Sequence, residues 1–249
     1  MNAVLTGKVV LVTGAAKRVG AEIVRHVHRA GAAVALHYRS AATEAESLVE
    51  ELNGARAGSA MALRADLIEV DRLPALVHAV LERFGRLDAL VNNASSFFST
   101  PLEGITDAQW VDLVGTNLKA PLFLARAAAA ALRDSRGAIV NITDIHAERP
   151  LKDFPIYCIA KAGLAGLTRS LALELAPEVR VNAVAPGPIQ WPESVDFDAI
   201  ERSAIIDHTL LKRVGEPADV ARTVMFLLAD APYVTGQILA VDGGRSAHL

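Results

Sequence analysis

The sequence contains a single cysteine, Cys158, so no disulfide can form within its 249 residues. This scarcity fits a reducing compartment. The thiol has no base paired with it in the sequence, and we interpret it as a packing residue and not as a nucleophile. The seven histidines form no HExxH motif, and no cysteine cluster accompanies them. The sequence therefore predicts no metal site.

An excess of charge of one sign is also missing. The chain has 25 basic and 28 acidic residues, for a net charge of -3, and no basic block that would follow a phosphate backbone. It has neither a basic leader followed by an apolar segment nor an uncharged run long enough to span a bilayer. We therefore expect a cytoplasmic protein that binds neither nucleic acid nor a membrane.

Hydrophobic residues make up 52% of the chain, which is enough for a substantial core. The length fits one large α/β domain or two small ones, and the lack of a linker favours a single domain over residues 1–249. Short apolar runs alternate with helix-length segments. This order predicts a doubly wound parallel sheet of the Rossmann type, with helices on both faces. The expected strands are 8–13, 32–38, 59–65, 88–93, 138–143, 180–186 and a last run at 237–244.

Glycine, proline and capping residues mark the expected helix boundaries. Gly31 is placed to follow the first helix, and Asp71 to open the third with Pro74 near its start. Thr106 and Pro217 are placed at the starts of two more helices.

The segment from 188 to about 210 breaks this alternation, because prolines and Trp191 are followed by mixed charged and apolar residues. Long irregular stretches in compact domains are often functional, so we predict a lid over a binding site. Trp191 in this segment fits stacking on a substrate or ordinary packing equally well.

An acid, a phenol and an amine occur together between 143 and 161. Tyr157 and Lys161 are four residues apart, so on a helix they share one face. We expect the ammonium to lower the pKa of the phenol from about 10 toward working pH, as a general acid or base requires. Asp144 follows a buried strand, at the sheet edge where ligands bind. The alternatives for Asp144 are a helix N-cap and a degenerate serine position in a protein that has lost catalysis.

The first expected strand runs into the turn TGAAKRVG at 13–20, which precedes a helix. Gly14 and Gly20 allow the backbone to approach a pyrophosphate at the helix N-terminus. Arg18 stands in the middle position, where a glycine is usual. Its guanidinium is placed to contact the phosphate or the substrate beyond it.

The end of the second expected strand indicates which nicotinamide cofactor is used. An acidic residue there would bind the ribose 2′-hydroxyl and repel a 2′-phosphate. The sequence has His37, Tyr38, Arg39 and Ser40 instead, so it favours NADP(H). The alternative is that Arg39 is a solvated loop charge.

Residues after the next two strands complete the expected cofactor site. Asp66 is placed to touch the adenine ring, while Asn93 and Ala94 are placed to line the floor beneath the ribose.

Taken together, these motifs resemble the short-chain dehydrogenase/reductase family over nearly the entire chain. The motifs are TGxxxxxG at 13–20, NNA at 92–94, Asn117 in a fourth helix, Tyr157 with Lys161, and Pro186 with Gly187. The resemblance implies a homotetramer assembled through two long helices at 106–132 and 156–175. It also implies further cofactor contacts from Leu67, Ser95, Tyr157, Lys161, Pro186, Gly187 and Ile189.

Two departures from the family pattern resemble the pteridine reductases of bacteria. Asp144 stands where the family normally has a serine, and NNASSFF at 92–98 stands where NNAG is usual. This resemblance implies a pterin site lined by Arg18, Ser95, Phe97, Asp144 and Tyr157, with Phe97 stacked on the ring. Phe97 and Phe98 fit loop anchors over the core as an alternative.

The chemistry of the residues agrees with a pterin substrate. An aspartate accepts hydrogen bonds and would repel a developing oxyanion, so it is a poor replacement for serine in ketone reduction. It suits a ring with N–H donors. The hypothesis is therefore an NADPH-dependent pterin reductase, in which Tyr157 donates a proton, Lys161 assists it, Asp144 orients the substrate and Asn117 supports the proton relay.

Two other functions remain open from the sequence. One is the reduction of a ketone, such as a 3-oxoacyl thioester, by the same fold. The other is a regulatory or structural NADP-binding protein without turnover.

Overall fold

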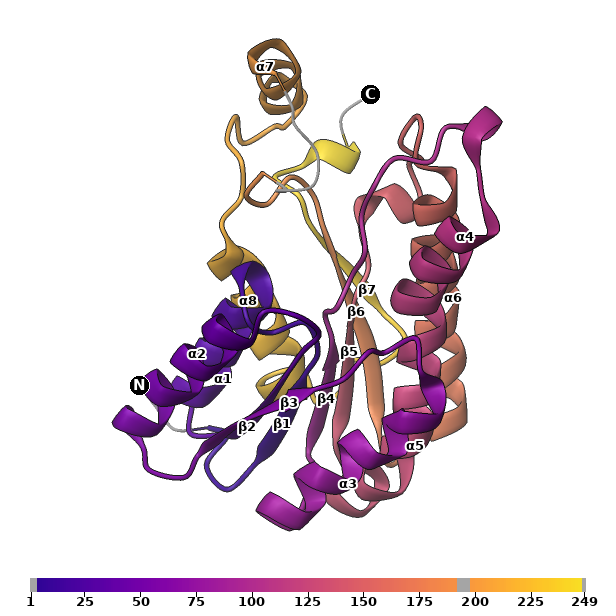
Figure 1. Cartoon of the computed structure of the whole chain (residues 1–249). Helices are drawn as coiled ribbons and strands as arrows, with labels where there is room; N and C mark the ends of the chain where they lie inside the picture. Colours follow the sequence, from indigo (N-terminus) through magenta and orange to yellow (C-terminus); the bar gives the residue numbers. More distant parts are fainter. Residues whose placement is uncertain (1–3, 192–197, 248–249) are drawn as a thin grey trace.

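The computed structural model describes residues 4–191 and 198–247. Its centre is a parallel sheet of seven strands in the order β3-β2-β1-β4-β5-β6-β7 (Figure 1). Every predicted apolar run contains one of these strands, which confirms the predicted doubly wound fold. The strands are β1 Val9–Val12, β2 Ala33–Tyr38, β3 Ala60–Arg64, β4 Ala89–Asn92, β5 Ala138–Ile142, β6 Arg180–Pro186 and β7 Ile238–Val241.

The strands are apolar on both sides because helices cover both faces of the sheet. In β1, Val10 and Val12 pack into one core, whereas Val9 and Leu11 pack into the other. Successive side chains of a strand point to opposite faces, so continuous apolar runs serve two cores at once. The first core lies under α1 Arg18–Arg29, α2 Ala42–Ala55 and α8 Pro217–Ala229; the second lies under α3 Leu73–Phe84, α5 Ala120–Ser135 and α6 Pro155–Leu175.

The predicted helix boundaries agree with the structure except at Asp71. Gly31, with φ +103°, follows the C-cap of α1. Thr106 forms a capping box with Gln109 at the start of α4 Asp107–Val114, and Pro217 begins α8. Asp71 does not open α3: it lies in a short 3₁₀ segment, Val70–Arg72, and α3 begins directly afterwards. A helical turn of i→i+3 bonds at an α-helix N-terminus is common, and only the backbone reveals it.

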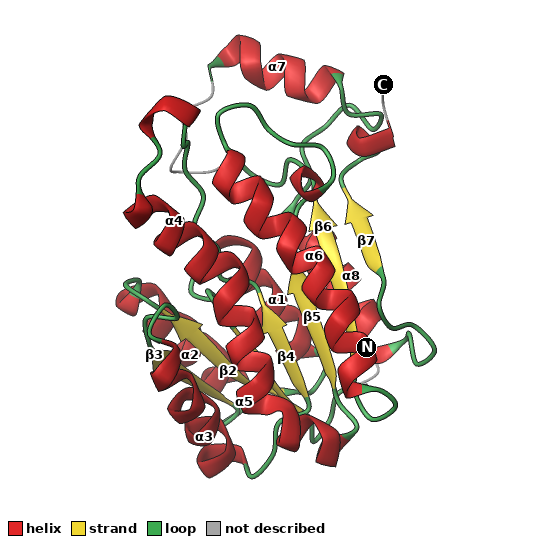
Figure 2. Cartoon of the chain, turned by 90° about the vertical axis from the view of Figure 1, so that its right-hand side faces the viewer, coloured by secondary structure: helices red, strands yellow, loops and turns green. Residues whose placement is uncertain are grey.

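The long helix expected at 106–132 is interrupted. A π-helical turn, Gly115–Lys119, separates α4 from α5 and contains Asn117. The extra residue in such a turn changes which side chains face the sheet, and π-turns often occur at functional sites. Figure 2 shows α4, α5 and α6 side by side in front of the sheet.

The order of the strands reverses on either side of β1, which pairs with β2 on one edge and β4 on the other. Ligands bind at such a switch point, outside the carboxyl ends of the strands. Above that end lies α7, Ala199–Asp207, which stands apart from the helices that flank the sheet (Figure 1). It belongs to the predicted lid, of which residues 192–197 lie outside the described part of the chain.

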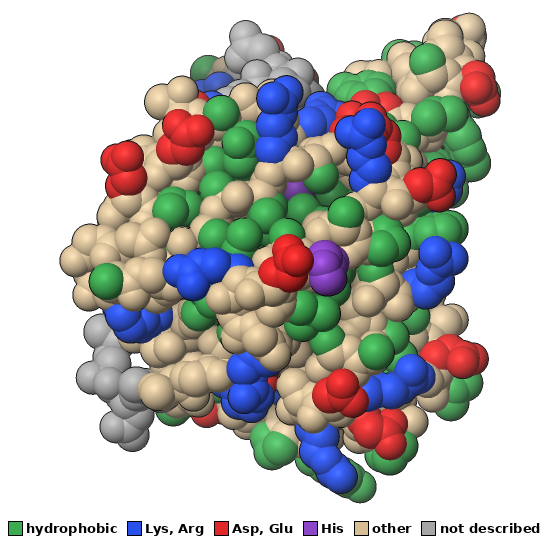
Figure 3. Space-filling model, turned by 60° about the horizontal axis from the view of Figure 1, so that its bottom comes forward, with side chains coloured by type: hydrophobic (Ala, Val, Ile, Leu, Met, Phe, Trp, Pro, Cys, Tyr) green, Lys and Arg blue, Asp and Glu red, His purple; other side chains and the backbone are tan. Residues whose placement is uncertain are grey.

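One helix, α6, is long and apolar enough to cross a membrane by length and composition. However, 56% of its apolar window is buried inside the protein, as in a core helix. On the face shown in Figure 3, the described basic and acidic side chains are interspersed and do not gather into a patch of one sign.

Candidate active site

Two adjoining cavities open at the carboxyl ends of the strands. The larger has a volume of about 630 Å³ and the smaller about 320 Å³. Residues from the start of α1, the end of β2 and the loop after β4 line both cavities, which therefore form one continuous cleft. These shared residues are Arg18, Val19, Arg39, Asn93, Ser95 and Ser96.

The glycine turn after β1 lines the smaller cavity. Gly14 has φ +60°, a conformation that residues with a side chain rarely adopt. A Cβ at Gly20 would lie 2.6 Å from Asn93 Nδ2, closer than real contacts allow. The Asn93 side-chain amide donates to the carbonyl oxygens of Thr13 and Gly14, at 2.9 Å each. The turn is thereby fastened to the loop after β4.

The N-terminus of α1 is built to receive an anion. Its first turn carries no acidic side chain, and the side chain of its N-cap residue, Lys17, makes no capping hydrogen bond. Unsatisfied N–H groups and the helix dipole both favour a phosphate at this point. Lys17, Arg18, Val19 and Gly20 line the smaller cavity beside it. The residues present thus fit the pyrophosphate of a dinucleotide.

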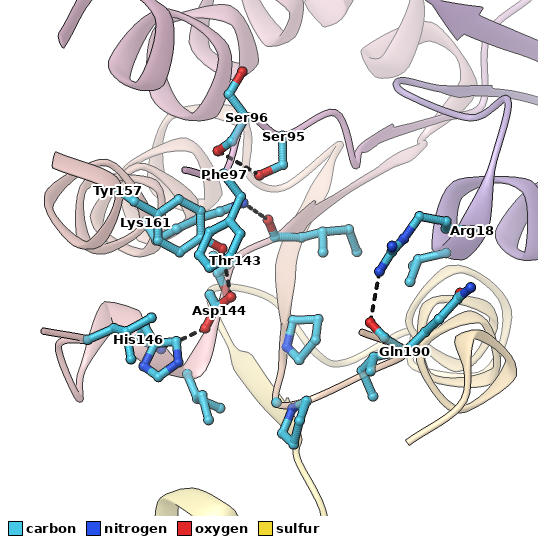
Figure 4. Close-up of a pocket in the computed structure, with 18 of the residues that line it drawn as sticks. Arg18, Ser95, Ser96, Phe97, Thr143, Asp144, His146, Tyr157, Lys161 and Gln190 are labelled. Atoms are coloured by element: carbon cyan, nitrogen blue, oxygen red, sulfur yellow. Dashed lines mark hydrogen bonds between the residues drawn. The ribbon is translucent and has the colours of Figure 1, made fainter. Parts of the chain in front are cut away.

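Arg18 also makes hydrogen bonds to a distant segment of the chain, which the sequence did not reveal. It begins α1 with φ +53°, and its guanidinium donates to the carbonyl oxygens of Gln190 at 2.8 Å and Trp191 at 2.9 Å. Figure 4 shows Arg18 and Gln190 together on the side of the pocket opposite Asp144 and Tyr157. Arg18 therefore joins the glycine turn to the first part of the segment predicted as a lid.

The four residues at the end of β2 differ in what they contact. His37 is buried: Nδ1 accepts from Gly14 N at 3.2 Å, and Nε2 lies 3.1 Å from Ala65 O. Burial lowers the pKa of His37, so the neutral ring braces the glycine turn. Arg39 is exposed, lines both cavities and lies 3.7 Å from Asp112 Oδ2. Tyr38 packs on the core and Ser40 is exposed; neither lines the cleft.

The loops after β3 and β4 complete the smaller cavity. Asp66, Leu67, Asn93 and Ala94, which the sequence analysis gave as cofactor contacts, all line it. The Asp66 carboxylate accepts a bond from Ile68 N at 3.1 Å, which fixes the loop in which it lies.

Tyr157 and Asp144 meet at the wall of the larger cavity. The Tyr157 hydroxyl donates to Asp144 Oδ2 at 2.6 Å (Figure 4). The other carboxylate oxygen, Oδ1, accepts from His146 N at 2.8 Å, at the start of the 3₁₀ segment Ile145–Ala147. Asp144 is therefore an N-cap, as one alternative predicted, while its other oxygen holds the phenol.

The prediction that the pKa of Tyr157 is lowered is wrong in direction. Burial, followed by the charge of Asp144 and its hydrogen bond, raises the pKa of the phenol well above 10. Ser95 opposes this shift only in part. Lys161 Nζ lies 5.6 Å from the Tyr157 ring centre and donates instead to Ile142 O at 3.0 Å. Burial lowers the pKa of Lys161 to about 8. Helical spacing predicted proximity correctly, but it could not predict that a carboxylate would be closer to the phenol.

Asn117 supports the loop after β4. Its Oδ1 accepts from Ser95 Oγ at 2.6 Å, and its Nδ2 donates to Ser96 O and Leu113 O at 2.9 Å each. The side chain is fully buried and does not line either cavity. Asn117 therefore reaches the cleft through Ser95.

Phe97 forms an apolar wall beside the phenol. Its ring stacks on Phe154, with the ring centres 4.7 Å apart, and meets the edge of the Tyr157 ring at 4.8 Å. Phe97 and Phe98 both line the larger cavity and pack on the same small core cluster. These aromatic residues therefore both line the pocket and anchor their loop on the core.

The segment after β6 forms the opposite wall, with Pro186, Gly187 and Ile189 all lining the larger cavity. A Cβ at Gly187 would lie 2.6 Å from Asp242 Cβ, so β6 and β7 approach closely here. Within the segment predicted as a lid, the Arg202 guanidinium lies 5.3 Å from the centre of the Trp191 ring. Cys158 is buried, and burial raises its pKa, which agrees with a packing role.

Three ionisable residues of the larger cavity were missed by the sequence analysis: Asp112, His146 and Arg245. Asp112 lies on α4, away from the strand ends that the sequence marked. His146 and Arg245 follow the expected strands 138–143 and 237–244, but no motif singled them out. Within residues 4–191 and 198–247, no group of three His, Cys, Asp or Glu side chains is arranged to hold a metal ion.

Comparison with known proteins relates the whole chain to reductases. A family model described as enoyl-(acyl carrier protein) reductase matches residues 14–246. Pteridine reductase 1 of Leishmania tarentolae is 38% identical over an alignment of 281 positions. This alignment covers 97% of this chain and 97% of that protein. A 3-oxoacyl-(acyl-carrier-protein) reductase of Staphylococcus epidermidis is 35% identical over 240 residues, 95% of this chain and 98% of that protein.

Proposed function

The chain belongs to the short-chain dehydrogenase/reductase family of oxidoreductases, and we propose that its reaction is the NADPH-dependent reduction of a pterin. The observation that carries this proposal is the 2.6 Å hydrogen bond from Tyr157 Oη to Asp144 Oδ2. A carboxylate at this position suits a ring that presents N–H donors. It would repel the oxyanion that develops when a ketone is reduced. The 38% identity to Pteridine reductase 1 supports the same substrate class.

The smaller cavity supports NADP(H) as the cofactor. The uncapped N-terminus of α1 and the glycines of the turn suit a pyrophosphate. The stretch from His37 to Ser40 contains no carboxylate, and Arg39 offers a guanidinium for a 2′-phosphate. When bound, the nicotinamide supplies the hydride, which passes to a carbon of a pterin C=N bond.

Tyr157 is the proposed proton donor. Burial and Asp144 raise its pKa, so the phenol keeps its proton at working pH. Proton transfer from a positioned acid contributes about 10²- to 10⁴-fold to a rate. The proton goes to the ring nitrogen of the reduced bond. We propose that Lys161, whose ammonium donates to Ile142 O, holds the cofactor ribose.

Asp144 is the proposed substrate anchor and proton relay. Its Oδ1 is fixed by His146 N, so Oδ2 is the oxygen that is available to exchange between the phenol and an N–H group of the substrate. Asn117 positions this site by holding Ser95 at 2.6 Å. We propose that the pterin ring lies against Phe97, with Arg18 on the opposite wall, because an aromatic pair is worth about 0.5–1.5 kcal/mol beyond burial.

The test is NADPH oxidation with dihydrobiopterin, dihydromonapterin and dihydrofolate, for the wild type and Asp144→Ser. We expect turnover of a dihydropterin by the wild type and its loss in the variant. Asp153→Asn is the matched control, because Asp153 is an exposed aspartate outside the cleft. Failure of every pterin would overturn the proposed function.

The 3-oxoacyl thioester remains the competing substrate, since a reductase of this substrate class is 35% identical to the chain. Acetoacetyl thioesters are therefore included in the assay, and their reduction without pterin turnover would establish that function. Tight NADPH binding without oxidation by any of these compounds would indicate a regulatory protein instead.

We further propose that residues 1–249 form one NADP-binding domain with a lid at about 188–210, and that the protein is a cytoplasmic homotetramer. Exposed apolar side chains on α4, α5 and α6 support assembly through these helices. They include Trp110, Val111, Leu122, Ile159 and Leu173. Light scattering on the purified protein tests the tetramer.

A further inference from the structure

The arginines that line the larger cavity differ in the number of N–H donors that already bind another group of the protein. Arg18 donates through both Nη1 and Nη2 to the backbone of the lid segment. Arg39 is exposed and faces the carboxylate of Asp112. Arg245 is half-buried and donates through Nη1 alone, to Ile205 O at 2.8 Å.

The position of Arg245 is at the lid end of the cleft. It begins the 3₁₀ segment Arg245–Ala247, which follows β7 and lies beneath α7 (Figure 1). Its partner Ile205 is part of α7, and both residues line the same cavity as Asp144 and Tyr157. A molecule held by Asp144 can therefore extend toward Arg245 within one cavity.

No carboxylate of the described residues forms a direct ion pair with Arg245, although the charge of Asp242 favours its cation. The nearest acidic neighbour in the sequence, Asp242, uses Oδ1 to accept from Gly244 N at 2.9 Å and Oδ2 to accept from Ser246 N at 2.7 Å. No ion pair involving Arg245 is formed among residues 4–191 and 198–247. A partly buried cation without a paired anion is costly, and a bound anion would offset that cost.

We propose that Arg245 is a specificity-determining residue that binds an anionic group on the side chain of the substrate, a carboxylate or a phosphate. This inference rests on the proposed pterin reductase function, because it places the ring at Asp144 and the side chain toward the lid. A guanidinium suits either anion, since it presents two parallel N–H donors to two oxygens. The bond to Ile205 O fixes the guanidinium and leaves its other donors for the ligand.

The experiment compares pairs of substrates that differ in charge. Dihydroneopterin and dihydroneopterin monophosphate differ by one phosphate, and dihydrobiopterin and dihydrofolate contrast a neutral side chain with one that carries carboxylates. Values of kcat and KM are measured for the wild type, Arg245→Gln and Arg245→Lys. Arg222→Gln is the control, because Arg222 is an exposed arginine on α8 that does not line the cavity.

In Arg245→Gln, we expect KM for the anionic substrate to rise about 10- to 100-fold, which corresponds to one or two charge-assisted hydrogen bonds. KM for the neutral member of the pair and both kcat values should change less than about twofold. Arg245→Lys should recover part of the loss. The pair that responds identifies phosphate or carboxylate as the anion.

Equal changes for charged and neutral substrates would overturn the inference and indicate a structural role for Arg245. No change in either pair would also overturn it, as would a wild type that reduces only the neutral pterins. These outcomes leave the proposed function intact, because dihydrobiopterin is still reduced. If the wild type reduces no pteridine, the proposed function fails first and the inference fails with it.

Discussion

The Tyr157 hydroxyl is bonded to Asp144 Oδ2 at 2.6 Å, whereas the Lys161 ammonium points to Ile142 O at 3.0 Å. The phenol is therefore paired with an anion and not with the cation one turn away. An anionic neighbour disfavours phenolate, so the pair keeps the proton on Tyr157 until a substrate with N–H donors competes for Asp144.

Replacing Asp144 with asparagine should lower the pKa of Tyr157, because the negative charge that opposes phenolate is removed. Pterin turnover should fall about 10²- to 10⁴-fold, the contribution of a positioned acid–base group. Ultraviolet titration of tyrosinate gives the pKa, with Tyr157→Phe used to assign the signal. An Asp144→Asn protein with unchanged titration and unchanged turnover would contradict the role given to this carboxylate.

Lys161 should make stability depend on pH in an uncommon direction. Its folded-state pKa is about 8, below its ordinary value of 10.5, so between these values the unfolded chain binds more protons. The contribution of Lys161 to stability is therefore unfavourable below about pH 8 and improves as pH rises to about 10.5. Relative to Lys161→Met, the wild type should gain roughly 2 kcal/mol between about pH 7 and 9.5. Urea unfolding at both pH values measures this, and a constant difference would show that Lys161 titrates normally.

Gly20→Ala should weaken NADPH binding and destabilise the fold by about 1–3 kcal/mol. The added Cβ would meet Asn93 Nδ2 at 2.6 Å and disturb the bonds that hold the turn. Gly166→Ala is the matched control, because Gly166 lies in α6 and its Cβ would meet nothing within 4 Å. That variant should be more stable by about 0.5–1 kcal/mol. Calorimetry measures the stability of the two variants, and NADPH titration measures their cofactor affinity. Equal changes in Gly20→Ala and Gly166→Ala would refute the packing argument.

Arg39→Ala should raise KM for NADPH about tenfold, the effect of one exposed charge-assisted contact, and leave KM for NADH unchanged. Arg64→Ala provides the control. Arg64 is an exposed arginine at the end of β3 and pairs in register with Tyr38, but it does not line the cleft. If Arg39 is only a solvated charge, both variants will match the wild type with both cofactors.

The backbone of the fold follows from local patterns. Continuous apolar runs such as 138–143 predicted buried parallel strands, because each strand must fill two cores. Thr106 and Pro217 predicted helix starts, because capping and proline geometry act within one turn. The π-helical turn at Asn117 escaped prediction, since no residue in Gly115–Lys119 excludes an ordinary α-helix.

The sequence alone determined the parallel α/β sheet, the glycine turn before α1, and the shared face of Tyr157 and Lys161, because these depend on residues within a few positions of each other. The tertiary structure decided the rest. Only the packing of α6 against β6 and against the 3₁₀ segment after β5 pairs the phenol with Asp144 and directs Lys161 to Ile142 O. Arg245 lies beyond β7, and only the tertiary fold brings it to the cavity that contains Asp144. Contacts between distant segments depend on how helices and strands pack, and no spacing in the sequence records that.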